Sequence, residues 1–528
     1  MRKPAFRTRQ RGAKKSREYS IKAPTGGWNT RENMAEMAEE FAIATDNMFG
    51  TTSDVRVRPG YANHVTGIGQ QVETLMAYNA QGGTQTFFGV ANDSVYNVTS
   101  AGAVGAAVVG SLSNARWQHF NFTNSAGTSY LCAFNGVDAP RYWNGSSWLT
   151  ITGVSTPAIT GLTTTDVVNG FVFKRRVYLI LNNSLSLYYL PVDSVGGEAK
   201  RTRLDGYFSR GGYLVSGATW TLDGGEGIDD YLVVISSEGQ VAVFEGTNPS
   251  SASSWALKGV WNVGEPVSNR CLIKYGGDLL INTTQGTIPL SKALQSSQGS
   301  EVAINEDEFL SYNINSAMVE AADDYKANFG WDLAFHPQGN MLILNVPVAE
   351  GSLQQQYVMN TTKGSWWRFT GLEANCWEVF NEELYYGTNG EVVKFGADVM
   401  NDGGDDIVTD LKQAFSYLGA RGRLKYVTAV RPNFSATGEP AVSMTFSVDF
   451  GDESPSTGLS FSPTQFAVWD TDAWDVGVWG GALSAFNDWQ TLGVVGTALA
   501  LRMKTVTSGI DVRYASSDTV YEYGGVIG

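Results

Sequence analysis

The chain contains 528 residues, of which 43% are hydrophobic and 17% charged, so it is long and apolar enough to bury the cores of about two to four domains. Its formal net charge of -15 argues against a general nucleic-acid-binding protein, because an acidic surface repels a phosphate backbone. The abundance of Gly (60), Trp (15), Tyr (23) and Phe (25) favours many short strands joined by glycine turns, so we expect an all-β protein.

The cysteines and the apolar runs bear on the compartment. Cys132, Cys271 and Cys376 are far apart and odd in number, which argues against a disulfide framework and against a thiolate metal site. The longest weakly polar run, residues 101–112, is too short to span a bilayer, and the basic N-terminus lacks the apolar core of a signal peptide. We therefore expect synthesis in a reducing cytoplasm and no membrane segment.

Residues 1–22 form a strongly basic N-terminal segment with nine Lys or Arg residues and the single acidic residue Glu18. No apolar period runs through it, so we expect an arm outside any core. The arm is either a solvated tail or an assembly element that docks on an acidic partner surface or touches DNA. The candidate interface residues in it are Arg7, Arg9, Arg11, Lys14 and Lys15.

Residues 23–69 are predicted to be an N-terminal docking segment that contains one short helix. A Pro-Thr-Gly-Gly loop leads to apolar residues at helical spacing, namely Met34, Met37, Ala38 and Phe41. The nearby carboxylates are better explained as the solvated face of this helix than as acid/base pairs; they are Glu32, Glu36, Glu39 and Glu40.

The stretch "SDVRVRPGYANH" (53–64) places Val55 and Val57 in alternation with Arg56 and Arg58. A strand here has an apolar face and an arginine face, and Pro59-Gly60 ends it. We expect the two guanidinium groups to pair with carboxylates of a neighbouring domain or subunit, so both arginines are candidate interface residues. The alternative is an exposed edge strand protected by its charges.

Between residues 70 and 400, seven hairpin signals follow one another. They are residues 86–98, 129–143, 177–190, 231–244, 278–290, 341–360 and 384–395. Their spacing is close to the roughly 40 to 50 residues of one four-stranded propeller blade. We predict a β-propeller of about six to eight blades; a long β-sandwich or a solenoid is the competing architecture, and a solenoid would show shorter, stricter periods.

After the acidic linker 398–410 the pattern changes. Residues 424–450 and 497–525 contain further strands, so residues 401–528 are predicted to form a β-sandwich or platform domain. Four tryptophans between residues 467 and 490 serve either packing or an interface, with packing favoured; they are Trp469, Trp474, Trp479 and Trp489.

Motifs for chemistry are absent or weak. His64, His119 and His336 are scattered, and no phosphate-binding loop or nucleophile elbow is present. Acidic loops 222–230 and 401–410 could ligate calcium, but solvated turns are the favoured reading. A glycosidase pair could be drawn from Asp223, Glu226, Asp229 and Asp230, although the spacing selects none. Trp366 and Trp367 are interpreted as blade packing. We expect no catalytic residue, no cofactor and no metal.

Several segments resemble one family. They are "APTGGWNTRENMAEM" (23–37), "ATDNMFGTTSDVRVRPGYANHVTG" (44–67), "YVMNTTKGSWWRF" (357–369), "LYYGTNGEVVKFG" (384–396), "GRLKYVTAVRPNFSATG" (422–438) and "VSMTFSVDFGD" (442–452). Together they are similar to the tail-tube proteins of short-tailed bacteriophages, the nozzle or packaged-DNA stabilisation family. The basic arm has no counterpart in this resemblance.

The resemblance implies a structural protein of the virion. Six copies would form a ring below the portal and adaptor proteins, with tail fibre, spike or needle proteins below or around it. The propeller of each subunit would build the wall, and DNA would pass through the centre without sequence-specific binding. The chain would be made in the host cytoplasm. The alternative is a host-surface propeller protein that binds or hydrolyses glycans.

Overall fold

The computed structural model describes residues 16–223, 228–296, 304–396, 399–455, 458–461 and 483–526. The chain divides into two compact units. One, which we call the propeller unit, contains Trp28–Arg31 and Arg58–Asp405; the other, the sandwich unit, contains Met1–Gly27, Glu32–Val57 and Asp406–Gly528. The two-residue strand β2 (Gly27–Trp28) contains the first boundary between them.

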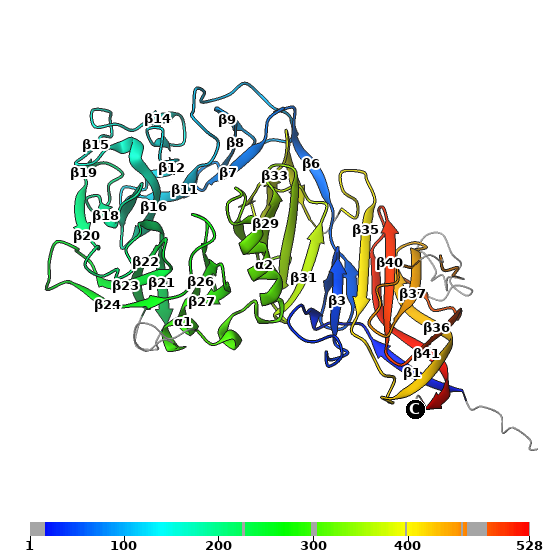
Figure 1. Ribbon diagram of the computed structural model, residues 1–528. Coiled ribbons are helices and arrows are strands. Elements are labelled where there is room, and N and C mark those ends of the chain that lie inside the picture. Colours follow the sequence, from blue (N-terminus) through cyan, green and yellow to red (C-terminus); the bar gives the residue numbers. More distant parts are fainter. Residues whose placement is uncertain are drawn as a thin grey trace, which may run out of the picture. The chain divides into compact units, whose positions relative to one another are not determined.

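Within the described part of the propeller unit, seven groups of three or four antiparallel strands follow one another as blades around an axis (Figure 1). Blades 1 and 2 contain β7 (Val72–Tyr78), β8 (Thr86–Ala91) and β9 (Ser94–Asn97), then β11 (Gln118–Thr123), β12 (Ser129–Phe134), β13 (Arg141–Trp143) and β14 (Trp148–Thr150). Blades 3 and 4 contain β16 (Val167–Phe173), β17 (Arg176–Leu181), β18 (Ser186–Tyr189) and β20 (Lys200–Arg203), then β21 (Leu214–Asp223), β22 (Ile228–Ser236), β23 (Gln240–Gly246) and β24 (Trp255–Asn262).

Blades 5 to 7 continue the same order. They contain β25 (Leu272–Tyr275), β26 (Asp278–Thr283) and β27 (Gly286–Pro289), then β28 (Asp332–His336), β29 (Met341–Ala349), β30 (Leu353–Asn360) and β31 (Ser365–Thr370), then β32 (Cys376–Phe380), β33 (Glu383–Gly387) and β34 (Val392–Phe395). Each predicted hairpin coincides with the two strands that follow the innermost strand of one blade. The propeller prediction is therefore confirmed, and its described residues form seven blades.

The ring closes between the last blade and the first. Strand β32 lies beside β7, and the Cys376 thiol donates to the Val72 carbonyl, with an Sγ to O distance of 3.6 Å. Strand β6 (Tyr61–Thr66) pairs antiparallel with β34 and supplies the fourth strand of blade 7, and the two-residue strand β10 (Gly102–Ala103) pairs parallel with its other edge. An early segment of the chain thus completes a blade whose other strands come from residues 376–395.

Small elements lie between the blades. They are the paired strands β15 (Ile159–Thr160) and β19 (Gly197–Glu198), the single-turn helices η1 (Thr164–Asp166), η2 (Glu306–Glu308) and η3 (Tyr312–Ile314), and the helices α1 (Leu290–Ser296) and α2 (Asn315–Tyr325). Met318, Ala321 and Ala322 of α2 are buried in the cluster shared with β29 and β30. Every helix among the described residues is too short or too polar to cross a bilayer.

The hydrophobic core of the propeller is divided among the spaces between neighbouring blades. Phe87 of blade 1 stacks on Phe380 of blade 7, with ring centroids 4.8 Å apart. Trp366 and Trp367 are 1% and 0% exposed, so their predicted role in blade packing is confirmed. Because each blade is held by the two beside it, the ring positions the residues that face its axis.

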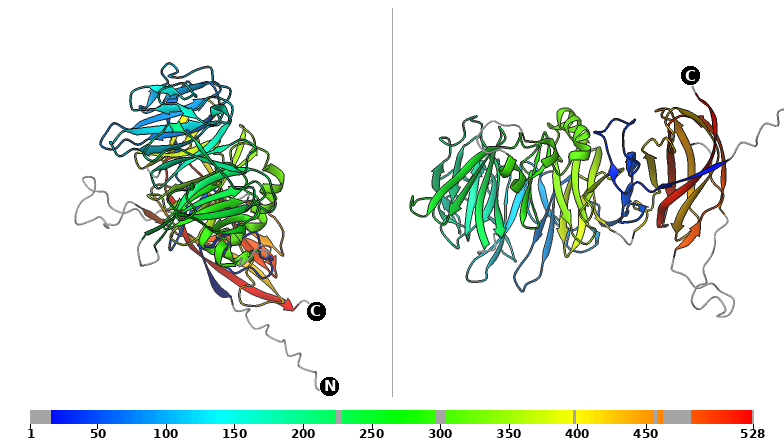
Figure 2. Two further views of the ribbon diagram at one scale, coloured as in Figure 1. Left: turned by 90° about the vertical axis from the view of Figure 1, so that its left-hand side faces the viewer. Right: turned by 90° about the horizontal axis from the view of Figure 1, so that it is seen from below.

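The sandwich unit is built from both ends of the chain. One sheet contains β1 (Arg17–Lys22), β4 (Met48–Gly50), β5 (Val55–Val57), β36 (Arg423–Ala436), β38 (Ser484–Phe486), β39 (Gln490–Gly496) and β41 (Val512–Val526). The other strands of the unit are β3 (Phe41–Asp46), β35 (Ile407–Gln413), β37 (Ala441–Val448) and β40 (Leu499–Thr507). Figure 2 shows β1, in dark blue, running along β41, in red, as the register from Arg17–Tyr521 to Lys22–Ser516 requires.

Two predictions for the N-terminal region are wrong. The described residues between 23 and 50 contain no helix: Asn33 closes a turn by accepting the N–H groups of Ala35 and Met37, at 2.9 and 3.0 Å, and Phe41 begins β3. A stretch of about two turns gains too little to offset helix nucleation, and an Asn side chain competes for the backbone. The predicted arm also ends earlier than residue 22, because β1 is part of a sheet and Ile21 is 4% exposed.

The domain boundaries also differ from the predicted ones. The expected docking segment, residues 23–69, is not separate: residues 32–57 belong to the sandwich unit and residues from Arg58 onward to the propeller unit. The propeller unit ends at Asp405, within the acidic stretch predicted to be the linker. The reason is pairing between segments far apart in the chain, such as Phe49 with Arg56 in β4 and β5 and Arg56 with Arg513 in β5 and β41.

Candidate functional site

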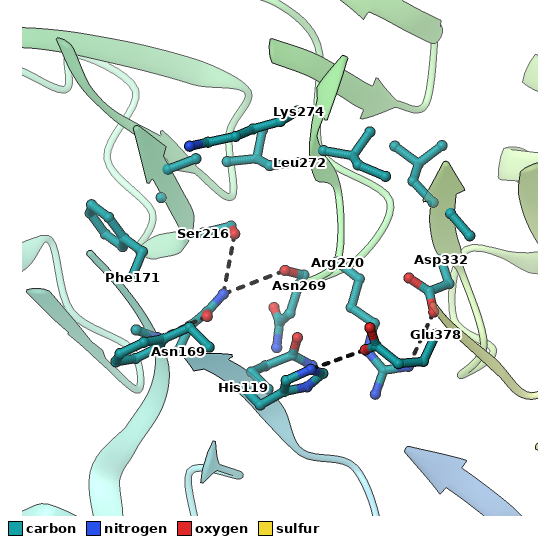
Figure 3. A pocket seen from close by; sticks show the side chains of 18 of the residues that line it. His119, Asn169, Phe171, Ser216, Asn269, Arg270, Leu272, Lys274, Asp332 and Glu378 are labelled. Carbon is teal, nitrogen blue, oxygen red and sulfur yellow. Dashed lines mark hydrogen bonds and ion pairs between the residues drawn. The ribbon is translucent and has the colours of Figure 1, made fainter. Parts of the chain in front are cut away.

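A pocket of about 560 Å³ lies on the axis of the propeller unit (Figure 3). The innermost strand of every blade contributes to its lining, namely β7, β11, β16, β21, β25, β28 and β32. Runs of consecutive residues in these strands line it, such as Gln118 to Asn121 of β11 and Ser216 to Thr219 of β21. The pocket therefore gathers residues from Leu75 to Val379 that are far apart in the sequence.

Arg270, at the start of blade 5, ties several blades together beside the pocket. Its Nη2 donates to the Thr74 hydroxyl at 2.9 Å in blade 1 and to the Trp117 carbonyl at 3.1 Å, just before blade 2. Its Nη1 lies 3.5 Å from Asp332 Oδ2 in blade 6. A planar guanidinium with several fixed donors is suited to such multiple contacts. This arginine serves first as a link across the ring.

Asp332 is a buried carboxyl, 8% exposed, that also accepts the Trp377 N–H at 3.2 Å. Burial raises the pKa of Asp332 above its usual value, although Arg270 and the Trp377 N–H act in the opposite direction. The geometry shows a carboxyl held between two blades by a cation and a backbone donor.

Two further sets of polar contacts join different blades at the pocket. His119 Nε2 lies 3.0 Å from Glu378 Oε2 and connects blades 2 and 7, as the dashed line in Figure 3 shows. Asn169 Nδ2 donates to the Ser216 hydroxyl at 3.2 Å and to the Asn269 carbonyl at 3.4 Å, which connects blades 3, 4 and 5. These contacts hold the ring and fix the shape of the pocket.

Some polar groups of the lining remain uncommitted. Among the described residues, the side chains of Lys274, Gln118 and Asn269 form no hydrogen bond or ion pair. The side chains of Lys274 and Asn269 are also exposed to solvent. Apolar side chains complete the wall, including Phe171 and Phe335. No three His, Cys, Asp or Glu side chains among the described residues converge as a metal site requires. The arrangement is that of a small polar and aromatic binding pocket.

The chain matches no protein-family profile and no curated protein sequence. Among solved structures it is similar to YCF48 bound to D1 peptide, with 12% identity, a TM-score of 0.37, and 70% of this chain and 100% of that chain covered. It is also similar to BBS1N in complex with ARL6DN, with 8% identity, a TM-score of 0.38, and coverage of 64% and 97%. Scores this low carry no argument about function, and the closed ring of blades itself identifies the fold.

The predicted interface arginines lie elsewhere. Arg58 is 0% exposed and forms two hydrogen bonds with Asp402 in the propeller unit, from Nη1 to Oδ1 at 2.9 Å and from Nη2 to Oδ2 at 2.6 Å. It also donates to the carbonyls of Pro59 and Thr370. The interface prediction for Arg58 therefore gives way to a buried role within the chain, because its side chain has no surface to offer to another subunit.

Arg56 lies in the sandwich unit between the buried side chains of Val55 and Val57, so the predicted alternation is confirmed over these three residues. The predicted arginine face is wrong, because β5 ends at Val57 and Arg58 is buried. Burial lowers the pKa of Arg56, while Asp511 of the same unit favours its charge. Its guanidinium lies 6.0 Å from the centre of the Phe49 ring. No contact with another subunit is needed to account for its position.

Several other predicted site residues cannot be compared with the structure. Arg7, Arg9, Arg11, Lys14 and Lys15 lie outside the described residues, as do Trp469, Trp474, Trp479 and Glu226. Of the acidic loops, Asp230 accepts the Thr221 hydroxyl at 2.7 Å and Asp402 is bound to Arg58, so both carboxylates have partners within the chain.

The pocket itself was not predicted. His119 and Glu378 are 259 positions apart in the chain, so no spacing in the sequence indicates that they meet. The sequence offers one indirect clue: the strands that precede the predicted hairpins contain polar residues, such as Asn169 and Ser216, and these line the pocket. His64 and His336 lie away from the pocket lining, and burial lowers the pKa of both imidazoles.

Proposed function

We propose that this protein is a structural subunit of the tail of a short-tailed bacteriophage, one copy in a ring-shaped nozzle that retains packaged DNA and conducts it during ejection. The observation that carries the proposal is a chain that resembles the nozzle family in segments of both units and combines a seven-bladed propeller with a separate sandwich unit. In this proposal the work is mechanical, without turnover, and six copies form the ring.

The propeller axis of a single subunit is not a passage for DNA. A cavity of about 560 Å³ has the size of a small-molecule pocket, and side-chain links from Arg270 and His119 join blades beside it. A conduit for a duplex must therefore be formed between copies. A closed cyclic arrangement provides one, because head-to-tail contacts that close into a ring leave no growing end.

The charge of the chain fits a conduit that does not grip its cargo. Each copy carries a net charge of -15, and the first 15 residues contain only basic charged residues, so the remainder is more acidic still. An acidic wall repels phosphates and avoids the strong, salt-dependent contacts of a basic groove. This supports passage of DNA without sequence-specific binding.

The test uses the full chain, alone and with its portal and adaptor proteins. Mass photometry and electron microscopy should show a closed ring, six copies in our expectation, at the tail axis below the adaptor. The purified chain alone should be a monomer or the same ring. A single copy, or an open spiral, on the tail axis would overturn the proposal. Release of reducing ends from host polysaccharide by the purified chain would favour the glycan-hydrolysing alternative instead.

A further inference from the structure

The axial pocket of the propeller unit has the size and rigidity of a ligand site. Its volume of about 560 Å³ lies within the range of small-molecule pockets. Links between blades hold its wall, from Asn169 to Ser216 and from His119 to Glu378 (Figure 3). A site with its wall already fixed loses little freedom when a ligand binds.

The charged side chains of the lining indicate which charged group a ligand would carry. Arg270 faces Asp332, and His119 faces Glu378. Lys274, in β25, is the charged lining residue for which no ion-pair partner is found in the described part of the chain, and Figure 3 shows its side chain at the pocket. A carboxylate brought by a ligand would complete this arrangement with a charge-assisted hydrogen bond.

The uncommitted neutral groups point to hydroxyls on the same ligand. The side-chain amides of Gln118 and Asn269 each offer donors and an acceptor, and a sugar hydroxyl can satisfy both kinds. Phe171 and Phe335 add apolar surface against which the carbon face of a sugar ring can pack. A hydrocarbon chain would leave the amides unpaired, and a phosphate group would be expected to meet more than one cation or a set of backbone N–H groups.

We infer that the axial pocket binds an acidic monosaccharide unit, a uronic acid, with its carboxylate on Lys274 and its hydroxyls on the amides of Gln118 and Asn269. The site is independent of ring assembly, because every lining residue belongs to the propeller unit of one chain. The ligand class is that of acidic polysaccharides, so the site would give a tail subunit a contact with a charged glycan.

The probe is free glucuronate, titrated into the full chain and followed by saturation-transfer NMR or calorimetry. For a ligand of about 13 non-hydrogen atoms at ordinary ligand efficiency, the expected Kd is on the order of 1 mM. Glucose lacks the carboxylate and should bind at least fivefold more weakly. Acetate lacks the ring and should show no saturable binding. Raising the salt concentration should weaken glucuronate binding, because screening reduces attraction to a partly exposed cation.

The deciding variant is Lys274→Met, which keeps the length of the side chain and removes its charge. It should weaken glucuronate binding at least fivefold and leave glucose binding unchanged. The matched control is Lys200→Met in β20, an exposed lysine outside the pocket, which should leave both affinities unchanged. Equal affinity for glucuronate and glucose, the absence of saturable glucuronate binding, or an unchanged affinity in Lys274→Met would each overturn the inference. Ring formation by Lys274→Met reports separately on the nozzle proposal.

Discussion

The buried pair between Arg58 and Asp402 predicts a large loss of stability when its negative partner is neutralised. The Arg58 side chain is 0% exposed, whereas that of Asp402 is 13% exposed. In Asp402→Asn the guanidinium stays buried and loses the charge that balances it. Such a break costs about 3 to 5 kcal/mol.

The expected shift in melting temperature follows from the size of the propeller unit. Residues 58–405 are about 350 residues, and unfolding entropy of about 2.1 cal/mol/K per residue gives about 0.7 kcal/mol/K. A loss of about 3 to 5 kcal/mol therefore lowers the melting temperature of this unit by about 4 to 7 °C. Differential scanning calorimetry at neutral pH measures it directly.

Two further variants make the interpretation specific. The control Asp205→Asn removes the negative partner of an exposed ion pair, in which Arg203 is 69% and Asp205 is 49% exposed. It should leave the melting temperature unchanged. Replacing both partners, as in Arg58→Met with Asp402→Leu, should be less harmful than Asp402→Asn alone, because no buried charge is left unpaired. If Asp402→Asn behaved like Asp205→Asn, the argument that this pair is a buried structural contact would fail.

Two other predictions concern packing and pH. The methyl group of Gly217→Ala would lie 2.3 Å from Phe171 Cε1, and overpacking of about 1 to 3 kcal/mol should lower the melting temperature. The control Gly105→Ala, whose methyl group has nothing within 4 Å, should leave the melting temperature unchanged. Equal melting temperatures for the two variants would contradict the close packing between blades 3 and 4. Burial alone would raise the pKa of Asp138, but hydrogen bonds from the Ser113 N–H at 2.8 Å and hydroxyl at 2.7 Å help to hold it below its usual value. The stabilisation from Asp138 is present above its unfolded pKa of about 4 and disappears as the pH falls through its lower folded pKa. Urea titrations should therefore show Ser113→Ala less stable than the unmodified protein at pH 7. The difference in unfolding free energy between the two proteins should narrow towards pH 3. A difference independent of pH would contradict it.

The sequence predicts local hairpins well, because strand alternation and turn residues lie within a dozen positions of one another. The stretch "YLVVISSEGQVAVF" (231–244) shows this: Val234 pairs with Ala242 across a turn that contains Gly239, whose φ of 76° suits glycine. The order of seven such hairpins was enough to predict the propeller.

The sequence predicts long-range pairing poorly. Nothing near Tyr61 indicates that it will pair with Phe395, or that β1 will pair with β41. Helical spacing near Met37 was a misleading signal, whereas the same spacing in Met318, Ala321 and Ala322 marks a real helix that was not predicted. Near Met37 the stretch is short and Asn33 closes a turn, whereas α2 is stabilised by packing against β29 and β30, which the local spacing does not reveal.

The closure of blade 7 by β6 has a consequence for synthesis on the ribosome. Strand β6 is translated before β7, but its partner β34 ends at Phe395, about 330 residues later, which takes roughly 15 to 65 s at common translation rates. Throughout that time the nascent chain carries strands with free edges and blades without their last neighbour. A chain released before Phe395 would keep an open ring, with apolar side chains such as Phe87 deprived of Phe380 or of the strand that covers it. Completion of the propeller therefore waits until Phe395 has left the ribosome.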